Sequence, residues 1–252
     1  MSELSNRTLA RGLDMLELLS ENPQGLELHQ IARLMELPKS TAYNLARTLT
    51  ACKYAYKQDD GKYLLGLKMF EVGSAAVNDL DITAVIRQYM RQVYNECNET
   101  MHCGMMTGRE VVYIDKLEST RSVRMSSRIG VRMPLHATAM GKALLASLTD
   151  AEIESLYSGV TLEKLTDKTI TSLSDLLTEM GRVREAGFAV ERGENCEGVT
   201  CQAVAIIARD GKPQYALSIS APSFRLTEEE ETANAALLLR AKRKIERFLK
   251  AT

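Results

Sequence analysis

Short polar side chains and one guanidinium are concentrated in the segment 39–48. An arginine pairs with guanine through two hydrogen bonds and an asparagine pairs with adenine, so Arg47 and Asn44 have the chemistry to read base edges in DNA. Ser40 and Thr41 suit phosphate contacts at the start of a helix. With two lysines from farther along the chain, the candidate DNA contacts are Lys39, Ser40, Thr41, Tyr43, Asn44, Arg47, Lys57 and Lys62.

The charge pattern permits DNA binding but does not decide it. The whole chain of 252 residues has 32 Lys+Arg and 33 Asp+Glu, which excludes a polybasic coat but not a small local reading surface. Residues 1–65 contain as many basic as acidic side chains, yet no acidic residue lies between Lys39 and Lys57. The alternative is a small helical subdomain whose polar face is merely solvated.

Three short helices and a hairpin are expected to position these side chains. Pro38 suits the start of the third helix, because its missing N–H needs no partner there. Alternating residues on both sides of Asp60-Gly61 predict strands at 54–57 and 62–65. Apolar spacing predicts these inward stripes: Leu9, Leu13, Leu16 and Leu19; Leu28, Ile31, Ala32 and Met35; Ala42, Leu45, Ala46 and Leu49. This order is that of a winged helix-turn-helix.

The remainder of the chain reads as an α/β domain with an antiparallel sheet. We expect a linking helix within 66–80 and a further helix at 82–97. Capping-box spacings at Thr149–Glu152 and Thr227–Glu230, and a weaker variant at Ser172–Asp175, predict helix starts. The strand candidates are 101–107, 111–117, 121–127, 200–208 and 214–220.

Four separated stretches of the chain resemble the IclR family of bacterial transcriptional regulators. The segment LELHQIARLMELPKSTAYNLARTL resembles the family's N-terminal domain. Downstream, MPLHATAMGKALLA, REAGFAVERGENCEGVTCQAVA and YALSISAPSFRLT are similar to its later signatures, in the right order. The resemblance implies an α+β chain: a winged helix-turn-helix (1–65), a linking helix (66–80) and a GAF-like α/β effector-binding domain (81–252).

The resemblance also implies partners and a pocket. Family members bind double-stranded operator DNA as homodimers, often paired into tetramers, and respond to small organic acids; many are repressors. Two departures matter: Ala139-Met140 is bulkier than the Gly-Ala of some members, and Val204-Ala205-Ile206 lacks a proline often found there. Carried over position by position, the effector-binding residues are Ala139, Met140, Glu191, Val199, Cys201, Ser218 and Ser220.

The chemistry of the pocket residues favours a hydroxylated acid as effector. Residues i and i+2 of a strand share a face, so two hydroxyl groups, from Ser218 and Ser220, point the same way. The helix start after Leu135-His136 offers unpaired N–H groups, and Glu191 suits ligand hydroxyls better than a bare carboxylate. We therefore expect a sugar acid or hydroxy acid; the alternative is that both serines only bond neighbouring strands.

Other classes of function remain as alternatives. An enzyme using Cys201 and Glu191 on a small acid would need a base, and His136 is the one candidate in the signature regions. A third interpretation is a sensor with a degenerate helix-turn-helix. The five cysteines show no CxxC spacing and the three histidines no HExxH pattern, so we expect no catalytic residue, metal or cofactor.

No run of 18 apolar residues occurs, which argues against a membrane span. The N-terminal segment MSELSNRTLARG has no apolar signal core. We therefore expect a cytoplasmic protein without membrane partners.

Overall fold

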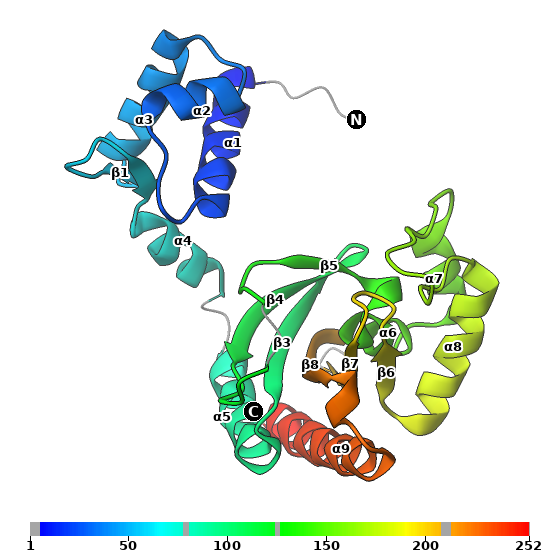
Figure 1. The fold of residues 1–252 in the computed structure, drawn as a ribbon. Coiled ribbons are helices and arrows are strands. Elements are labelled where there is room, and N and C mark those ends of the chain that lie inside the picture. Colours follow the sequence, from blue (N-terminus) through cyan, green and yellow to red (C-terminus); the bar gives the residue numbers. More distant parts are fainter. Residues whose placement is uncertain (1–5, 78–80, 124–126, 208–212, 252) are drawn as a thin grey trace. The chain divides into compact units, whose positions relative to one another are not determined.

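The chain folds into two compact units, residues 1–80 and 81–252. The structure is a computed structural model that describes residues 6–77, 81–123, 127–207 and 213–251. The finer division into 1–65, 66–80 and 81–252 stays a prediction. The first unit contains α1 (Arg7–Glu21), α2 (Leu28–Leu34), α3 (Lys39–Ala51), β1 (Ala55–Lys57), β2 (Tyr63–Leu65) and α4 (Lys68–Val77) (Figure 1).

Local capping explains where the first helices begin and how they connect. Asn6 caps α1 by accepting the N–H of Leu9, and Asn22 is the C-cap at the other end of this helix. Glu27 and Gln30 cap α2 through reciprocal side-chain to backbone bonds. Glu36 then adopts a left-handed conformation with φ of 52°, which turns the chain between α2 and α3.

The buried stripe of α1 differs from the prediction. Leu9 and Leu13 are 62% and 52% exposed, whereas Met15, Leu16 and Leu19 are buried. The reason is that α1 packs on α3 and on β2 through its C-terminal half. The stripes predicted for α2 and α3 do face the core, with Ile31, Ala32, Ala42, Leu45 and Ala46 buried.

The second unit is built on a six-stranded antiparallel sheet with the strand order β5-β4-β3-β8-β7-β6. Its strands are β3 (Thr100–Thr107), β4 (Glu110–Leu117), β5 (Arg132–Pro134), β6 (Ala189–Arg192), β7 (Val199–Ile207) and β8 (Pro213–Pro222). Its helices are α5 (Asp81–Cys97), α6 (Ala139–Leu145), α7 (Asp150–Tyr157), α8 (Leu173–Ala186) and α9 (Glu228–Ala251), with short 3-10 turns at Leu135–Ala137 and Ser223–Arg225.

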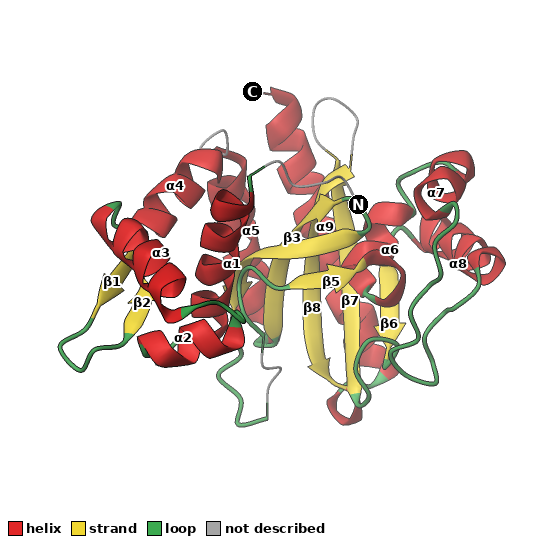
Figure 2. Cartoon of the chain, turned by 90° about the horizontal axis from the view of Figure 1, so that it is seen from above, coloured by secondary structure: helices red, strands yellow, loops and turns green. Residues whose placement is uncertain are grey.

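Helices cover both faces of this sheet. The helices α5 and α9 pack against one face and against each other, and α6 packs on the opposite face. Figures 1 and 2 show α7 and α8 beyond α6, at the β6 end of the sheet. Because side chains alternate along a strand, Ala216, Ser218 and Ser220 of β8 point to the α6 face, while Leu217 and Ile219 point to α5 and α9.

Most predicted elements of this unit are confirmed, but one strand is wrong. Residues 121–123 are bends and residue 127 is not in a strand, while 124–126 lie outside the described residues. The outer edge of β4 pairs instead with β5, where Val111 lies opposite Met133. Arg121 turns back to the Glu99 carboxylate, so this segment leaves the sheet. Of the predicted strand 200–208, residue 208 also lies outside the described residues.

The three predicted capping motifs are present. Thr149 and Glu152 form a reciprocal capping box, and so do Thr227 and Glu230. Ser172 accepts the N–H of Asp175 at the start of α8. These motifs fix where α7, α8 and α9 begin.

Two glycines allow α6 to lie unusually close to its surroundings. A Cβ atom on Gly141 would lie 2.2 Å from both Cα and O of Leu135. A Cβ on Gly104 of β3 would lie 2.4 Å from Cγ2 of Val111 and 3.1 Å from the sulfur of Met140. The N-terminal turn of α6 therefore lies directly on the backbone of the 3-10 turn before it, and Gly104 leaves room on β3 for the Met140 side chain.

We predict that Gly141→Ala destabilises the second unit by about 3 kcal/mol or more, because the new methyl group meets backbone atoms that cannot move aside. Gly181→Ala in α8 is the matched control: its Cβ meets nothing within 4 Å. That control should gain up to about 1 kcal/mol, the difference in helix propensity. Urea unfolding of the two variants tests this, and equal stabilities would contradict the packing argument.

Candidate functional site

The exposed face of α3 presents most of the predicted DNA contacts together. Lys39, Ser40, Tyr43, Asn44 and Arg47 are exposed, and Thr41 is half-buried. The guanidinium carbon of Arg47 lies 6.0 Å from the ring centre of Tyr43. The guanidinium and the ring thus lie close together on the exposed face of the helix, where arginine donors can meet a ligand.

The first turn of α3 offers backbone N–H groups that a ligand could bind. Its N-cap, Pro38, offers no side-chain acceptor, and the Pro38 carbonyl accepts the N–H groups of Thr41 and Ala42. Within the described residues the N–H groups of Lys39 and Ser40 have no partner. A phosphate oxygen fits such donors, because the positive end of the helix dipole lies there.

The hairpin lysines differ from each other. Lys57 is exposed, with its ammonium 5.6 Å from the ring centre of Tyr63. Lys62 is half-buried and lies 3.4 Å from the Asp60 carboxylate, whose pKa is lowered mainly by the N–H of Lys62. Lys57 is therefore the freer of the two charges.

All seven predicted effector-binding residues line one cavity in the second unit. They come from the start of α6 and from the strands β6, β7 and β8, with Val199 the first residue of β7. The space open to a water molecule is small, about 20 Å³. The full lining is Tyr113, Thr138, Ala139, Met140, Glu191, Asn195, Cys196, Val199, Cys201, Ser218 and Ser220.

Glu191 holds the loop that closes the cavity. Its Oε1 accepts the N–H groups of Glu194 and Asn195, the latter at 3.1 Å. Burial raises the pKa of Glu191, and these two N–H groups oppose the rise. Oε1 of Glu191 is thus already hydrogen-bonded to the protein backbone. If Glu191 binds the hydroxyl groups of a ligand, as the sequence predicts, it does so through its other carboxylate oxygen.

A buried polar chain runs along the floor of the cavity. The thiol of Cys201 donates to Ser220 Oγ at 3.1 Å, and this oxygen lies 3.5 Å from His102 Nδ1. The other ring nitrogen of His102 lies 2.7 Å from Ser127 Oγ. Burial raises the pKa of the Cys201 thiol, and the nearby Glu191 carboxylate adds to the rise. A thiol held protonated in this way is a poor nucleophile.

Comparison with known proteins decides the family. The model of the IclR helix-turn-helix domain matches residues 8–59, and the model of the bacterial transcriptional regulator IclR C-terminal matches residues 74–247. The chain belongs to the IclR family of transcriptional regulators. The predicted fold, a helix-turn-helix followed by an α/β domain, is thereby confirmed.

Individual IclR-family relatives agree over nearly the whole chain. The HTH-type transcriptional regulator XynR of Escherichia coli K12 is 35% identical over 225 residues, 89% of each chain. The HTH-type transcriptional repressor AllR of the same strain is 33% identical over 92% of this chain and 86% of its own. The crystal structure of the Thermotoga maritima IclR has a TM-score of 0.84 at 30% identity, covering 96% of this chain and 98% of that one.

Membership of the IclR family removes two of the alternatives. The chain is a regulator that binds DNA through its helix-turn-helix, and it is not an enzyme acting through Cys201 and Glu191. His136, the base that such an enzyme would need, is buried against the Glu163 carbonyl at 2.9 Å. Within the described ranges, no helix is both long and apolar enough to cross a membrane.

Sequence reasoning missed four residues that line this cavity: Tyr113, Thr138, Asn195 and Cys196. Thr138 carried a signal, since a threonine two residues before Met-Gly-Lys is the N-cap of α6 and accepts the N–H of Gly141. Tyr113 carried none, because the strand that presents it reads as ordinary β-sheet. The loop residues Asn195 and Cys196 lie directly after Glu194, and Glu191 helps to hold this loop by accepting the N–H groups of Glu194 and Asn195.

Lys142, directly after Gly141 in the IclR-type signature, is almost fully buried. Its ammonium lies 2.6 Å from Glu194 Oε1 and 3.2 Å from Glu179 Oε1. Thr166 and Thr169 donate their hydroxyls to the Gly193 and Glu194 carbonyls. This ion cluster ties α6 to α8 and to the loop over the cavity.

We predict that His102 makes the second unit sensitive to acid. Burial, aided by the charge of Lys116, lowers the pKa of His102 to about 4. An unfolded histidine titrates near pH 6.5, so the stabilisation by the neutral ring is complete above that pH and is lost progressively as the pH falls to about 4. The loss from this residue is about 3 kcal/mol.

Urea unfolding at pH 7.0, 5.5 and 4.5 measures this effect in the wild type and in His102→Gln. The variant should lose stability less steeply, because its amide does not take up a proton. The control His29→Gln removes an exposed imidazole from α2 in the first unit. Parallel pH profiles for wild type and His102→Gln would contradict the assignment.

Proposed function

We propose that the chain is a ligand-responsive repressor, acting in the cytoplasm on a bacterial operon for the catabolism of a small organic or sugar acid. The main support is that one unit carries an exposed helix with base-reading side chains, while the other encloses a polar cavity lined by all seven effector-binding candidates. That AllR, a relative, is a repressor favours this sign of regulation.

In this proposal α3 enters the major groove. Arg47 pairs with a guanine and Asn44 with an adenine. Lys39, Ser40 and Thr41 contact phosphates at the helix start, Tyr43 supports Arg47, and Lys57 and Lys62 contact the flanking backbone. A homodimer places two such helices on a roughly palindromic operator, and pairing of dimers into tetramers is left open.

The effector acts by shifting a population of conformations. A ligand that binds one arrangement of the regulator more tightly than the other changes operator affinity by that difference in free energy. The linking segment 66–80 contains α4 and joins the two units, so it is the lever in this mechanism.

The lining of the cavity favours a hydroxylated acid as effector. None of the residues lining it carries a basic side chain, so hydroxyl, amide and backbone groups must supply the donors. Ser218 and Ser220 share one face of β8, with the Tyr113 ring beside them. Such a set matches the several oxygens of a sugar acid or hydroxy acid better than an apolar molecule.

We predict that Arg47→Ala weakens binding to the operator by about 1–3 kcal/mol and relaxes the preference at one base pair. The operator is first selected from random duplexes by repeated rounds of binding. Gel shifts at fixed salt then compare the variant with Arg182→Ala, which removes another exposed arginine, from α8 in the other unit. If Arg47→Ala binds like that control, Arg47 does not read bases.

We also predict that Ser218→Ala combined with Ser220→Ala abolishes the effector response and leaves operator binding intact. A thermal-shift screen of sugar and hydroxy acids identifies a ligand that raises the Tm of the wild type, since a ligand of the native state must stabilise it. Ser147→Ala, in the same unit but bonded to Ala143 O away from the cavity, is the control. A double variant that responds normally would refute the pocket assignment.

A further inference from the structure

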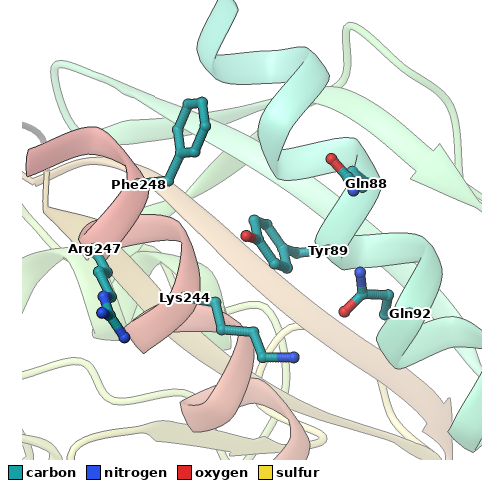
Figure 3. Close-up of a pocket in the computed structure, with 6 residues that line it drawn as sticks. All are labelled: Gln88, Tyr89, Gln92, Lys244, Arg247 and Phe248. Carbon is teal, nitrogen blue, oxygen red and sulfur yellow. The ribbon is translucent and has the colours of Figure 1, made fainter. Parts of the chain in front are cut away.

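The face of the second unit formed by α5 and α9 has an open groove of about 540 Å³ (Figure 3). Most of the side chains that line it are exposed, so water competes with any ligand for their polar groups. They are Gln88, Tyr89, Gln92, Lys244, Arg247 and Phe248. The opposite face of the sheet holds a different kind of polar side chain: His102, which has no exposed surface and lies beside the cavity of the candidate site.

His102 contacts two residues that line the cavity. Its Nδ1 lies 3.5 Å from Ser220 Oγ, and its ring centre lies 4.6 Å from that of Tyr113. Its Nε2 lies 2.7 Å from Ser127 Oγ, in the segment between β4 and β5. Each ring nitrogen therefore faces a serine hydroxyl, which can either donate or accept a hydrogen bond.

The imidazole of His102 carries a single proton at neutral pH. Burial, aided by the charge of Lys116, lowers its pKa to about 4. A neutral ring has one N–H donor and one bare acceptor, so it donates to one serine and accepts from the other. The directions of the two hydrogen bonds are thus linked: if one of them reverses, the other reverses too.

The hydroxyl proton of Ser220 has two possible acceptors. Ser220 Oγ already accepts the thiol proton of Cys201 at 3.1 Å, and burial raises the pKa of that thiol, which keeps it protonated. The O–H of Ser220 can donate to Nδ1 of His102. A ligand in the cavity can take the same O–H, because Ser220 lines the cavity.

We propose that His102 is a positioning residue that sets the direction of the Ser220 hydroxyl, and that an acid is recognised by reversing that direction. The proposal rests on the function proposed above, since it takes an acid into the cavity. In the empty domain Ser220 donates to Nδ1, and Nε2–H donates to Ser127 Oγ. With a carboxylate in the cavity, Ser220 donates to the ligand, Nδ1–H donates to Ser220 Oγ, and Ser127 donates to Nε2.

The reversal conserves both the protons and the hydrogen bonds of the ring. A carboxylate only accepts, so once it takes the Ser220 proton, the Ser220 oxygen presents a lone pair to Nδ1. Two buried acceptors that face each other are costly, and the ring avoids this by releasing its Nε2 proton to solvent and taking one up at Nδ1. The ring stays neutral, because the charge of Lys116, whose ammonium lies 3.0 Å from the Ser127 carbonyl oxygen, disfavours an imidazolium.

The same geometry separates acids from neutral polyols. In the empty arrangement, Ser220 Oγ uses one of its two lone pairs on the Cys201 thiol. A ligand hydroxyl can donate to the other lone pair, and the His102 ring then keeps its proton on Nε2. A carboxylate has no proton to donate and therefore requires the reversal.

The position of the ring proton can be measured by ¹⁵N NMR of the full chain at pH 7.0. The chain has three histidines, and the signals that disappear in His102→Gln belong to His102. Nitrogens with and without a proton resonate far apart. The probes are D-gluconate and D-sorbitol, which has a CH₂OH group in place of the carboxylate. We expect the proton on Nε2 in the empty chain and with sorbitol, and on Nδ1 with gluconate.

Two variants of Ser220 test the reversal without any ligand. Ser220→Asp places a carboxylate, which only accepts, beside Nδ1 and should put a proton on that nitrogen. Ser220→Asn is the matched control: its side chain is nearly isosteric but can donate through its amide, so Nδ1 should stay without a proton. If the buried carboxylate prevents folding, the empty wild type and its two probes still decide.

Four results would overturn the proposal. They are a proton on Nδ1 in the empty chain, gluconate raising the Tm without moving the proton, gluconate leaving both nitrogens protonated, and equal protonation of Nδ1 in the two Ser220 variants. A different result separates this proposal from the one above. If no acid raises the Tm but the two Ser220 variants differ as expected, the effector class is wrong and the positioning role of His102 stands.

Discussion

The close packing of α6 on the 3-10 turn before it is the constraint on which the cavity lined by the predicted effector-binding residues depends. Gly141 allows the helix to lie on the backbone of Leu135, and Gly104 leaves room on β3 for the Met140 side chain. Because α6 packs this closely, Thr138, Ala139 and Met140 line the same cavity as Ser218 and Ser220.

The buried ammonium of Lys142 further restricts how α6 packs against α8 and the loop at 193–198. Removing a lysine from water is costly, and the two carboxylates of Glu179 and Glu194 offset that cost only in one arrangement of α6, α8 and the loop at 193–198. Loss of the lysine alone would leave the Glu194 carboxylate without its cation, whereas Glu179 would keep Arg182, 3.4 Å away. The cluster therefore fixes where the loop lies, and the loop carries Asn195 and Cys196 to the cavity.

The sequence predicted well what depends on local chemistry. The capping motifs, the exposed face of α3 and the seven pocket residues that share one cavity all follow from spacing or from family signatures. It failed where distant contacts decide. Leu9 and Leu13 have helical spacing but stay largely exposed, and the sequence 121–127 alternates like a strand although β5 occupies the outer edge of β4. Likewise, only the folded structure reveals that one carboxylate oxygen of Glu191 accepts hydrogen bonds from two backbone N–H groups.

The smallness of the cavity has a thermodynamic consequence. A space of about 20 Å³ admits little more than a water molecule, so a metabolite of several carbons enters only a widened form of the domain. If that form is populated at about one part in a hundred, the apparent Kd is about a hundredfold weaker than the intrinsic one. Substitutions that loosen the 193–198 loop would then sharpen sensitivity to the metabolite without touching a single atom that binds it. For a ligand that binds in this cavity, the apparent Kd thus depends as much on the free energy of opening the empty domain as on the contacts that the ligand makes.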